Sequence, residues 1–234
     1  MNIAILSDVH SNFTALEAVL EDAKKRGCQQ FLSLGDIAGY GAEPGECIDL
    51  LQQHNVLNVM GNHDSYLLGH TNCPRSKVVN DIIAFQKSVV TQPQLDWLSK
   101  SIPYLIQDED YFTHGGWDNY LDQYLYRISE SVFPEKAKRF FTGHTHVQVL
   151  AHFGDRLYCN PGSVGQPRDG DPRAAYAILH NDSVEVFRVA YDIDKTVSTM
   201  KSAGFAENFY KNLYIGAQIG GRIDSVSIIK HEGI

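Results

Sequence analysis

Five short blocks in this sequence place carboxylate, imidazole and amide side chains directly after short apolar runs. Imidazole and carboxylate together suit first-row transition metals better than Ca²⁺ or Mg²⁺ alone. Two such ions, held roughly 3.5–4 Å apart, can clamp both oxygens of an in-line phosphoryl displacement and lower the pKa of bound water. The residue types therefore predict a dinuclear metal centre, with Asp36 as the bridging carboxylate. The blocks are Asp8-Val9-His10, Gly35-Asp36, Gly61-Asn62-His63-Asp64, His114-Gly115-Gly116 and Gly143-His144-Thr145-His146.

Each block alone also has an ordinary structural explanation. Asp36 could cap a turn, His114 could be a hydrogen-bonded histidine in a hairpin, and an Asp-x-His pair is common on protein surfaces. His144 and His146 are stronger evidence for metal binding, because a glycine-flanked pair of histidines on the same side of the chain has few structural uses. Since all five blocks follow strand-like runs, the sequence favours the metal-binding interpretation.

The apolar runs before the blocks predict the strands that position them. Residues 2–6, 31–34 and 56–60 alternate with helical patterns, which favours right-handed crossovers and a largely parallel sheet. The carboxyl ends of such strands meet at one edge, where ligands bind in open α/β sheets. Because side chains alternate along extended backbone, Asp8 and His10 are expected to point the same way.

The second half of the chain is predicted to be β-rich. Residues 147–159 and 175–189 indicate two hairpins, so the strands there are expected to run antiparallel. A helical pattern then extends over residues 193–218. We expect one domain over residues 1–234, in which residues 192–234 form a C-terminal helical extension of unknown role.

A tyrosine-rich polar stretch follows His114 and has no clear periodicity. Tyr120, Tyr124 and Tyr126 could pack together as ordinary hydrophobic residues, which is the commoner use of such a stripe. Their closeness to His114 in the sequence keeps a role as a substrate platform open.

Composition and charge limit the partners that this chain can take. Of its 234 residues, 43% are hydrophobic and 21% charged, as in an ordinary globular protein. A net charge of −8 opposes binding to an extended nucleic acid. Four scattered cysteines without a C-x-x-C pair indicate a reducing compartment. The first residues lack a basic signal-peptide region and no apolar run approaches membrane length, so we expect a cytoplasmic protein without a membrane partner.

The five blocks, in this order, resemble the calcineurin-like metallophosphoesterase superfamily. The resemblance spans residues 1 to about 165 and includes the segment Asn160-Pro161-Gly162-Ser163. It is greatest to the small, uncapped bacterial and archaeal phosphodiesterase-like members. The resemblance implies an α/β (α+β) fold in which two mixed β-sheets pack as a sandwich with flanking helices.

The resemblance also implies roles for individual residues. Two divalent transition-metal ions are expected as cofactors, with Mn²⁺ the first choice and Fe, Zn, Ni or Co also compatible. His63 would face the substrate as the catalytic residue, stabilising the transition state or protonating the leaving oxygen. One metal would take Asp8, His10, Asp36 and His146, and the other would take Asp36, Asn62, His114 and His144.

Departures from the family pattern bear on the substrate. The Ser/Thr protein phosphatases have an Asp and an Arg where this chain has Gly39 and Tyr40, and they have Glu where it has Asp64. These differences disfavour phosphoproteins and favour a small phosphoester, above all a phosphodiester attacked in line by metal-bound hydroxide. Arg168 could replace the missing phosphate contact, or it could be a solvated loop arginine.

Other functions remain open at the level of sequence. A dinucleoside-polyphosphate hydrolase or a phosphomonoesterase could use the same scaffold and the same ligands. A metal-binding interaction module without activity is a non-enzymatic alternative, although binding alone does not require all eight residues. A nuclease is disfavoured by the net charge of −8 and by the lack of a basic stripe.

Overall fold

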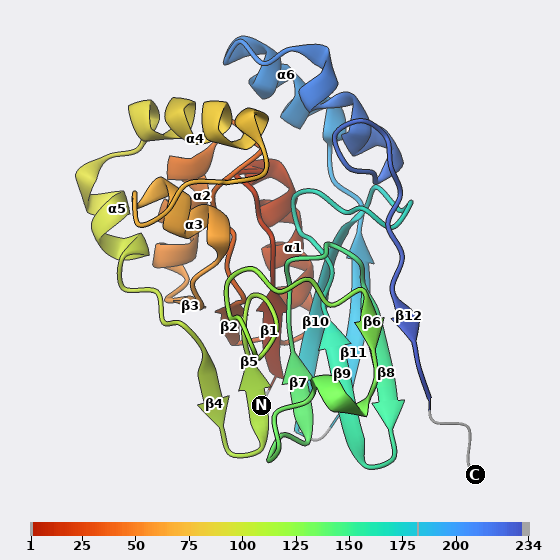
Figure 1. The fold of residues 1–234 in the computed structure, drawn as a ribbon. Helices are drawn as coiled ribbons and strands as arrows, with labels where there is room; N and C mark the ends of the chain where they lie inside the picture. Colours follow the sequence, from red (N-terminus) through yellow and green to blue (C-terminus); the bar gives the residue numbers. More distant parts are fainter. Residues whose placement is uncertain (1, 182, 231–234) are drawn as a thin grey trace.

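The structure, a computed structural model, describes residues 2–181 and 183–230. Its first sheet has the strand order β11-β10-β1-β2-β3 (Figure 1). Strands β1, β2 and β3 run parallel, and β10 and β11 extend the sheet as the predicted antiparallel hairpin. β3 is shorter than the predicted run 56–60, because its pairing with β2 ends at Asn58 and Val59 forms an isolated bridge to Ile102. The strands are β1 (Asn2–Leu6), β2 (Gln30–Ser33), β3 (Leu57–Asn58), β10 (Ala174–His180) and β11 (Ser183–Val189).

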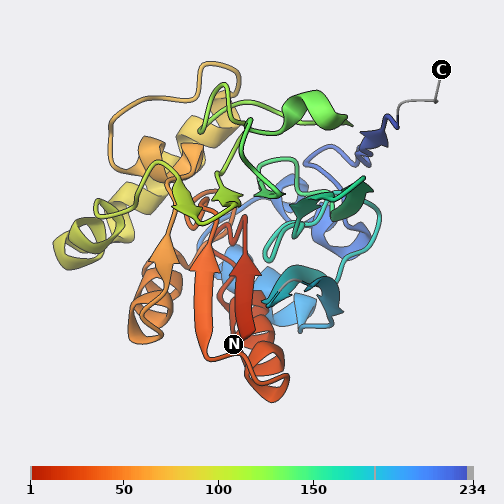
Figure 2. The same cartoon turned by 90° about the horizontal axis from the view of Figure 1, so that it is seen from below.

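The second sheet has the order β4-β5-β7-β9-β8 and packs face to face against the first (Figure 2). Strands β5, β7 and β9 are parallel, and β8 pairs antiparallel with β9 in the other predicted hairpin. Ile5 and Ala177 of the first sheet contact Phe141 and Cys159 of the second in the core between them. The predicted sandwich of two mixed sheets is confirmed. Its strands are β4 (Leu105–Gln107), β5 (Asp110–Phe112), β7 (Arg139–Phe141), β8 (Val149–Phe153) and β9 (Arg156–Asn160).

Different structures cover the two outer faces of the sandwich. Ala4 and Leu6 alternate with Ile5 along β1, so they face away from the second sheet and pack against helices. The outer face of the second sheet is covered instead by the mostly irregular segment 117–137, which includes the short turn η1 (Glu130–Val132). The first five helices are α1 (Phe13–Lys25), α2 (Pro44–Gln53), α3 (Asn62–Leu67), α4 (Lys77–Val89) and α5 (Gln92–Leu98).

The C-terminal segment is not the continuous helix predicted over 193–218. Helix α6 (Ile193–Ser202) ends before Gly204, whose φ of 86° is incompatible with helix continuation. Two short 3₁₀ turns follow, η2 (Glu207–Phe209) and η3 (Lys211–Ile215). A short strand, β12 (Ser227–Ile228), then pairs parallel with β6 (Arg127–Ile128), so the segment returns along the second sheet (Figure 1).

Within the described residues, no helix combines the length and the apolar character that crossing a bilayer requires. Cys28, Cys47, Cys73 and Cys159 are all free thiols. Apolar packing and backbone hydrogen bonds, rather than disulfides, therefore hold the described part of the chain together.

Candidate metal centre

The predicted blocks lie in the loops after β1, β2, β5 and β7 and at the first turn of α3. Strands β1 and β2 are parallel in one sheet, and β5 and β7 are parallel in the other. Their carboxyl ends therefore meet at the same edge of the sandwich, where the five blocks come together. Backbone bonds join the loops there: Asp8 N–H donates to the Gly35 carbonyl (3.0 Å) and His10 N–H to the Asp36 carbonyl (2.9 Å).

Left-handed backbone turns, rather than strand alternation, orient these ligands. Asp8 has a φ of 54° and His10 a φ of 47°, so the expectation that extended backbone points both side chains the same way is wrong. Non-glycine residues adopt this conformation at a cost and tend to do so at functional sites. The same left-handed conformation occurs at Asp36, His144 and His146.

One buried group of possible ligands contains Asp8, His10 and His146, whose ligand atoms all lie within 4.8 Å of one another. The Nε2 atoms of His10 and His146 are 3.0 Å apart. Oδ1 of Asp8 lies 3.3 Å from Nε2 of His146 and 3.7 Å from Nε2 of His10. Two ring nitrogens and one carboxylate oxygen thus converge on one point.

A second buried group contains Asp36, His114 and His144. Nε2 of His114 lies 3.0 Å from Nδ1 of His144 and 3.3 Å from Oδ2 of Asp36. Oδ1 of Asn62 also lies 3.0 Å from this Nε2. Oδ2 of Asp36 is 3.7 Å from Nε2 of His10 in the first group, so one carboxylate oxygen lies between the two groups.

The hydrogen bonds around both groups fit metal ions. Three rings place Nδ1 2.6–2.9 Å from a backbone carbonyl, which fixes a proton on Nδ1 and turns Nε2 toward the centre. Oδ1 of Asp8 is buried without a hydrogen-bond partner, although a buried carboxylate oxygen is costly to leave unpaired. A cation would satisfy it. The ring and carbonyl pairs are His10 with Ala38, His114 with Leu34, and His146 with Gln166.

Electrostatics at the centre agree with metal binding. Burial lowers the pKa of His10 and of His146 well below the usual value, and it lowers the pKa of His144 to about 4. These rings are therefore neutral near pH 7, which is the form that binds a metal. Burial also opposes a charge on His114, but the neighbouring Asp36 carboxylate raises the pKa of His114 to about 9. In the ion-free protein, Nε2 of His114 thus carries a proton, and a bound cation would take the place of that proton.

Two glycines of the blocks allow the loops to approach closely. A Cβ atom on Gly61 would lie 2.2 Å from Oδ1 of Asp36, and one on Gly143 would lie 2.0 Å from Oγ of Ser7. Both distances are far below van der Waals contact, so a larger residue at either position would displace a ligand loop. This close packing explains why glycine precedes ligands in these blocks.

His63 is buried beside the ligands but belongs to neither group. Its ring packs against the rings of His10 (4.9 Å between centroids) and Tyr40 (4.8 Å), and its Nδ1 has no hydrogen-bond partner among the described residues. Gly39 leaves room for the ring, because a Cβ atom there would lie 2.2 Å from Nδ1. Burial lowers the pKa of His63 to about 4, so the ring is neutral near pH 7, which favours stabilising the transition state over protonating the leaving oxygen.

A pocket of about 630 Å³ opens beside the two groups, and Asn62, His63 and Arg168 line it. Arg168 is not a solvated loop residue, because only 6% of it is exposed. Its Nη2 donates to Oε1 of Gln166 (2.9 Å), its Nε is buried without a partner, and its guanidinium lies 5.3 Å from the centre of the Tyr40 ring. No carboxylate within the described ranges pairs with it, so an anionic ligand would compensate its charge.

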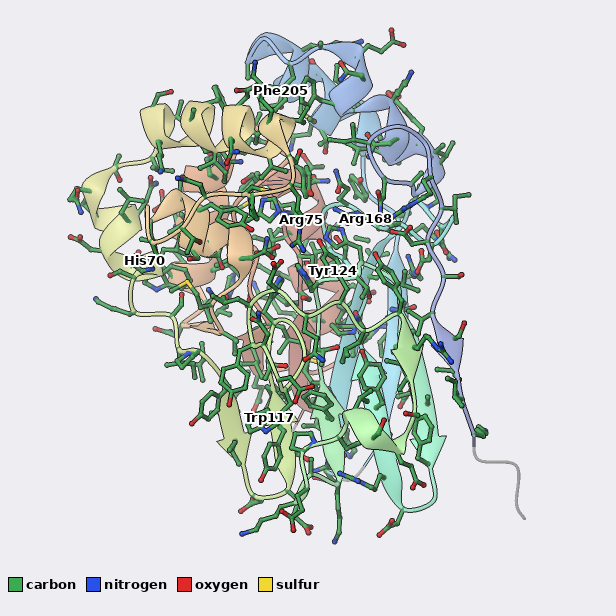
Figure 3. The ribbon with its side chains drawn as sticks, viewed as in Figure 1. His70, Arg75, Trp117, Tyr124, Arg168 and Phe205 are labelled. Carbon is green, nitrogen blue, oxygen red and sulfur yellow. The ribbon has the colours of Figure 1, made fainter. Side chains whose placement is uncertain are left out.

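Residues outside the five blocks also contact the centre. Oδ1 of Asp122 lies 3.5 Å from Nε2 of His144, and Arg75 forms an ion pair with the same carboxylate. The Tyr124 ring lies 3.8 Å from the His144 ring, and Figure 3 shows Arg75, Arg168 and Tyr124 close together in the middle of the molecule. The sequence did not single out Asp122 or Arg75, because neither belongs to a spaced motif.

The tyrosine stripe divides between its two possible roles. Tyr124 and Tyr126 line the pocket, as a platform would. Tyr120 packs against Tyr104 and Trp117 and is therefore a structural residue.

Two buried His/Asp groups at the joint edge of two mixed sheets define a metal-dependent hydrolase of the phosphoesterase type. The model of the calcineurin-like phosphoesterase superfamily domain matches residues 1–183, and the chain belongs to this family. It is therefore an enzyme, a metallophosphoesterase that hydrolyses ester bonds, with a site suited to two metal ions.

Comparisons with individual proteins agree with the family. The chain is 35% identical to the uncharacterized protein MJ0912 of Methanocaldococcus jannaschii, over 92% of this chain and 98% of that protein. It is 28% identical to phosphodiesterase YfcE of Escherichia coli, over 80% and 91% of the two chains. A solved metallophosphoesterase structure from Sphaerobacter thermophilus is 33% identical, covers 92% of this chain and 99% of its own, and superimposes with a TM-score of 0.80.

Proposed function

We propose that this enzyme hydrolyses a small phosphodiester. The observation that carries the proposal is the guanidinium of Arg168. It is buried, it forms no ion pair with a carboxylate of the described residues, and it lines a pocket that reaches the metal groups. Similarity to phosphodiesterase YfcE supports the same activity. A diester carries one negative charge, which suits a single buried arginine better than a phosphomonoester dianion does.

In this proposal the two metal sites share Asp36. Its Oδ2 lies 3.3 Å from His114 and 3.7 Å from His10, as a bridging oxygen requires. We propose Mn²⁺ as the ion at both sites, because imidazole and carboxylate ligands accept it. When bound, the two ions supply Lewis-acid activation of water and of the phosphoryl oxygens. One site comprises Asp8, His10, Asp36 and His146, and the other comprises Asp36, Asn62, His114 and His144.

The protein side chains hold the substrate and stabilise the leaving oxygen. Arg168 binds a non-bridging oxygen of the phosphate, since its planar guanidinium fits that group. His63 faces the same pocket with a neutral ring, so it donates a hydrogen bond through N–H to the leaving oxygen and stabilises the charge that develops there. The low pKa of His63 favours this role over that of an imidazolium acid.

The test is hydrolysis of bis-p-nitrophenyl phosphate beside p-nitrophenyl phosphate by metal-stripped protein, before and after Mn²⁺ is restored. Faster cleavage of the diester that depends on the metal is expected. Preference for the monoester would replace the proposal with a phosphomonoesterase. Failure to cleave either compound with two metals bound would leave a narrow natural substrate or a binding role, and failure to take up metal would overturn the assigned ligands.

A further inference from the structure

Arginine side chains gather at the substrate pocket, although the whole chain is acidic. The sequence carries a net charge of −8, yet three arginines and no acidic residue are found among the described residues that line the pocket. Arg168 alone suffices for one diester phosphate, so Arg75 and Arg222 are additional positive groups. A pocket of about 630 Å³ is also much larger than a phosphate and lies in the range of pockets for whole small-molecule ligands, roughly 300–1,000 Å³.

The C-terminal extension forms one wall of this pocket through Gln218, Ile219 and Arg222. Backbone hydrogen bonds hold the wall at both flanks. Before the wall, Gly170 N–H donates to the Gly216 carbonyl (2.9 Å), and after it Asp224 N–H donates to the Arg168 carbonyl (2.7 Å). Hydrogen bonds therefore fix the wall to the rest of the fold. Figure 1 shows the course of this segment toward β12.

Both additional arginines keep donors available for a ligand. Nε of Arg222 donates to Oδ1 of Asp224 (3.0 Å), which orients the side chain, while its terminal nitrogens have no partner in the part of the chain that the structure describes. Arg75 uses one terminal nitrogen for Asp122 and lies 5.4 Å from the centre of the Tyr124 ring. An arginine has five N–H donors, so each of these arginines keeps donors that can bind an anion besides those used for its own carboxylate partner.

Aromatic and apolar groups line the rest of the pocket. Tyr124 and Tyr126 are stacked with their rings nearly parallel, at an interplanar angle of 2°. Val79 and Ile219 add apolar surface to the lining. Such a surface accepts a planar ring with its sugar, while the arginines bind anions.

We propose that the substrate is a nucleotide that carries a second phosphate besides the scissile phosphodiester. Arg168 would hold the scissile phosphate at the metal groups, Arg222 and Arg75 would hold the second phosphate, and the tyrosines would contact the nucleoside. This inference rests on the proposed phosphodiesterase function and adds the chemical class of its substrate. It also gives the C-terminal extension a role, because Arg222 selects the substrate.

The test compares two chromogenic substrates that differ by one phosphate. These are the p-nitrophenyl ester of thymidine 5′-monophosphate and the same compound with a 3′-phosphate. The Mn²⁺-loaded wild type is expected to show kcat/KM roughly tenfold or more higher for the second compound, the value of one charge-assisted hydrogen bond. Arg222→Gln is expected to reduce this ratio toward one, because kcat/KM falls more for the 3′-phosphorylated compound than for the unphosphorylated one or for bis-p-nitrophenyl phosphate.

Arg173→Gln is the matched control, because Arg173 forms an exposed ion pair with Asp171 and does not line the pocket. It should leave the substrate ratio unchanged. Equal rates on both thymidine compounds in the wild type would overturn the inference. An Arg222→Gln variant that lost activity on all three substrates equally would also overturn it, since the residue would then be structural.

Binding separates this inference from the proposed function. Calorimetry on the Mn²⁺-loaded protein should show thymidine 3′,5′-bisphosphate binding about tenfold or more tightly than thymidine 5′-monophosphate, with the difference lost in Arg222→Gln. If bis-p-nitrophenyl phosphate is hydrolysed but neither kinetics nor binding distinguishes the paired compounds, the nucleotide inference alone fails. If no diester is cleaved, the proposed function fails, and the binding comparison then decides only whether the pocket prefers a nucleotide with two phosphates.

Discussion

Replacing Asp64 with asparagine should destabilise the ion-free protein, although Asp64 belongs to neither ligand group and does not line the pocket. Its buried carboxylate accepts N–H bonds from Ile37 and Ala38 at Oδ1, and from Asp36 and Gly61 at Oδ2, at 2.9–3.2 Å. Asparagine keeps one acceptor oxygen and turns an NH₂ group toward the other amides. Two buried N–H groups thus lose a charged acceptor at about 1.5–3 kcal/mol each, or about 3–6 kcal/mol together.

Calorimetric unfolding in EDTA at pH 8 measures this loss without a contribution from bound metal. Burial raises the pKa of Asp64 to about 7, so pH 8 favours the carboxylate in the wild type. For a chain of this size, about 2 °C of Tm per kcal/mol predicts a decrease of roughly 6–12 °C. Asp96→Asn is the control, because Asp96 is on the exposed side of α5 and accepts one bond from Gln92. A Tm within about 1 °C of the wild type in Asp64→Asn would refute the view that this carboxylate holds the Asp36 loop.

Three further variants test the centre itself. Asp36→Asn should lower the metal content below two ions per chain by mass spectrometry and abolish activity, because one carboxylate serves both groups; a variant that retained both ions would contradict the shared role. His63→Ala should lower kcat by about 10²–10³-fold with the metal content unchanged. If the metal were lost instead, His63 would belong to the ligands. Asp122→Asn should weaken the binding of one of the two ions by about 10–100-fold, because its carboxylate faces Nε2 of His144. Unchanged titration curves for both ions would remove Asp122 from the support of this ligand.

The metal centre was predictable because its ligands follow the strands in short, dense blocks. Asp36 follows β2 and His114 follows β5, so finding the strands was enough to place them at one edge. The reason given for Asp8 and His10 was nevertheless wrong. Their side chains converge through successive left-handed turns, and a period of two residues carries no information about such turns.

The pocket was not predictable from local patterns. Arg75 and Asp122 come from irregular segments far apart in the sequence, one after α3 and the other after β5, and only the fold brings them together. The helix predicted over 193–218 failed for a related reason. Phe209 and Leu213 keep a helical spacing with Phe205, but Gly204 ends α6 and the later residues pack as short 3₁₀ turns. Apolar spacing alone does not distinguish one long helix from a helix and two turns.

Net charge and pocket charge bear on different kinds of ligand. An extended nucleic acid contacts a large part of the protein surface, so the total charge of −8 opposes its binding at many contacts. A nucleotide inside the pocket meets mainly the groups that line it. Arg168 and Arg222 are close to such a ligand, and Arg168 is shielded from water. Buried charges act more strongly than screened surface charges do. An acidic protein can therefore repel extended nucleic acids and still select a small substrate with two phosphates.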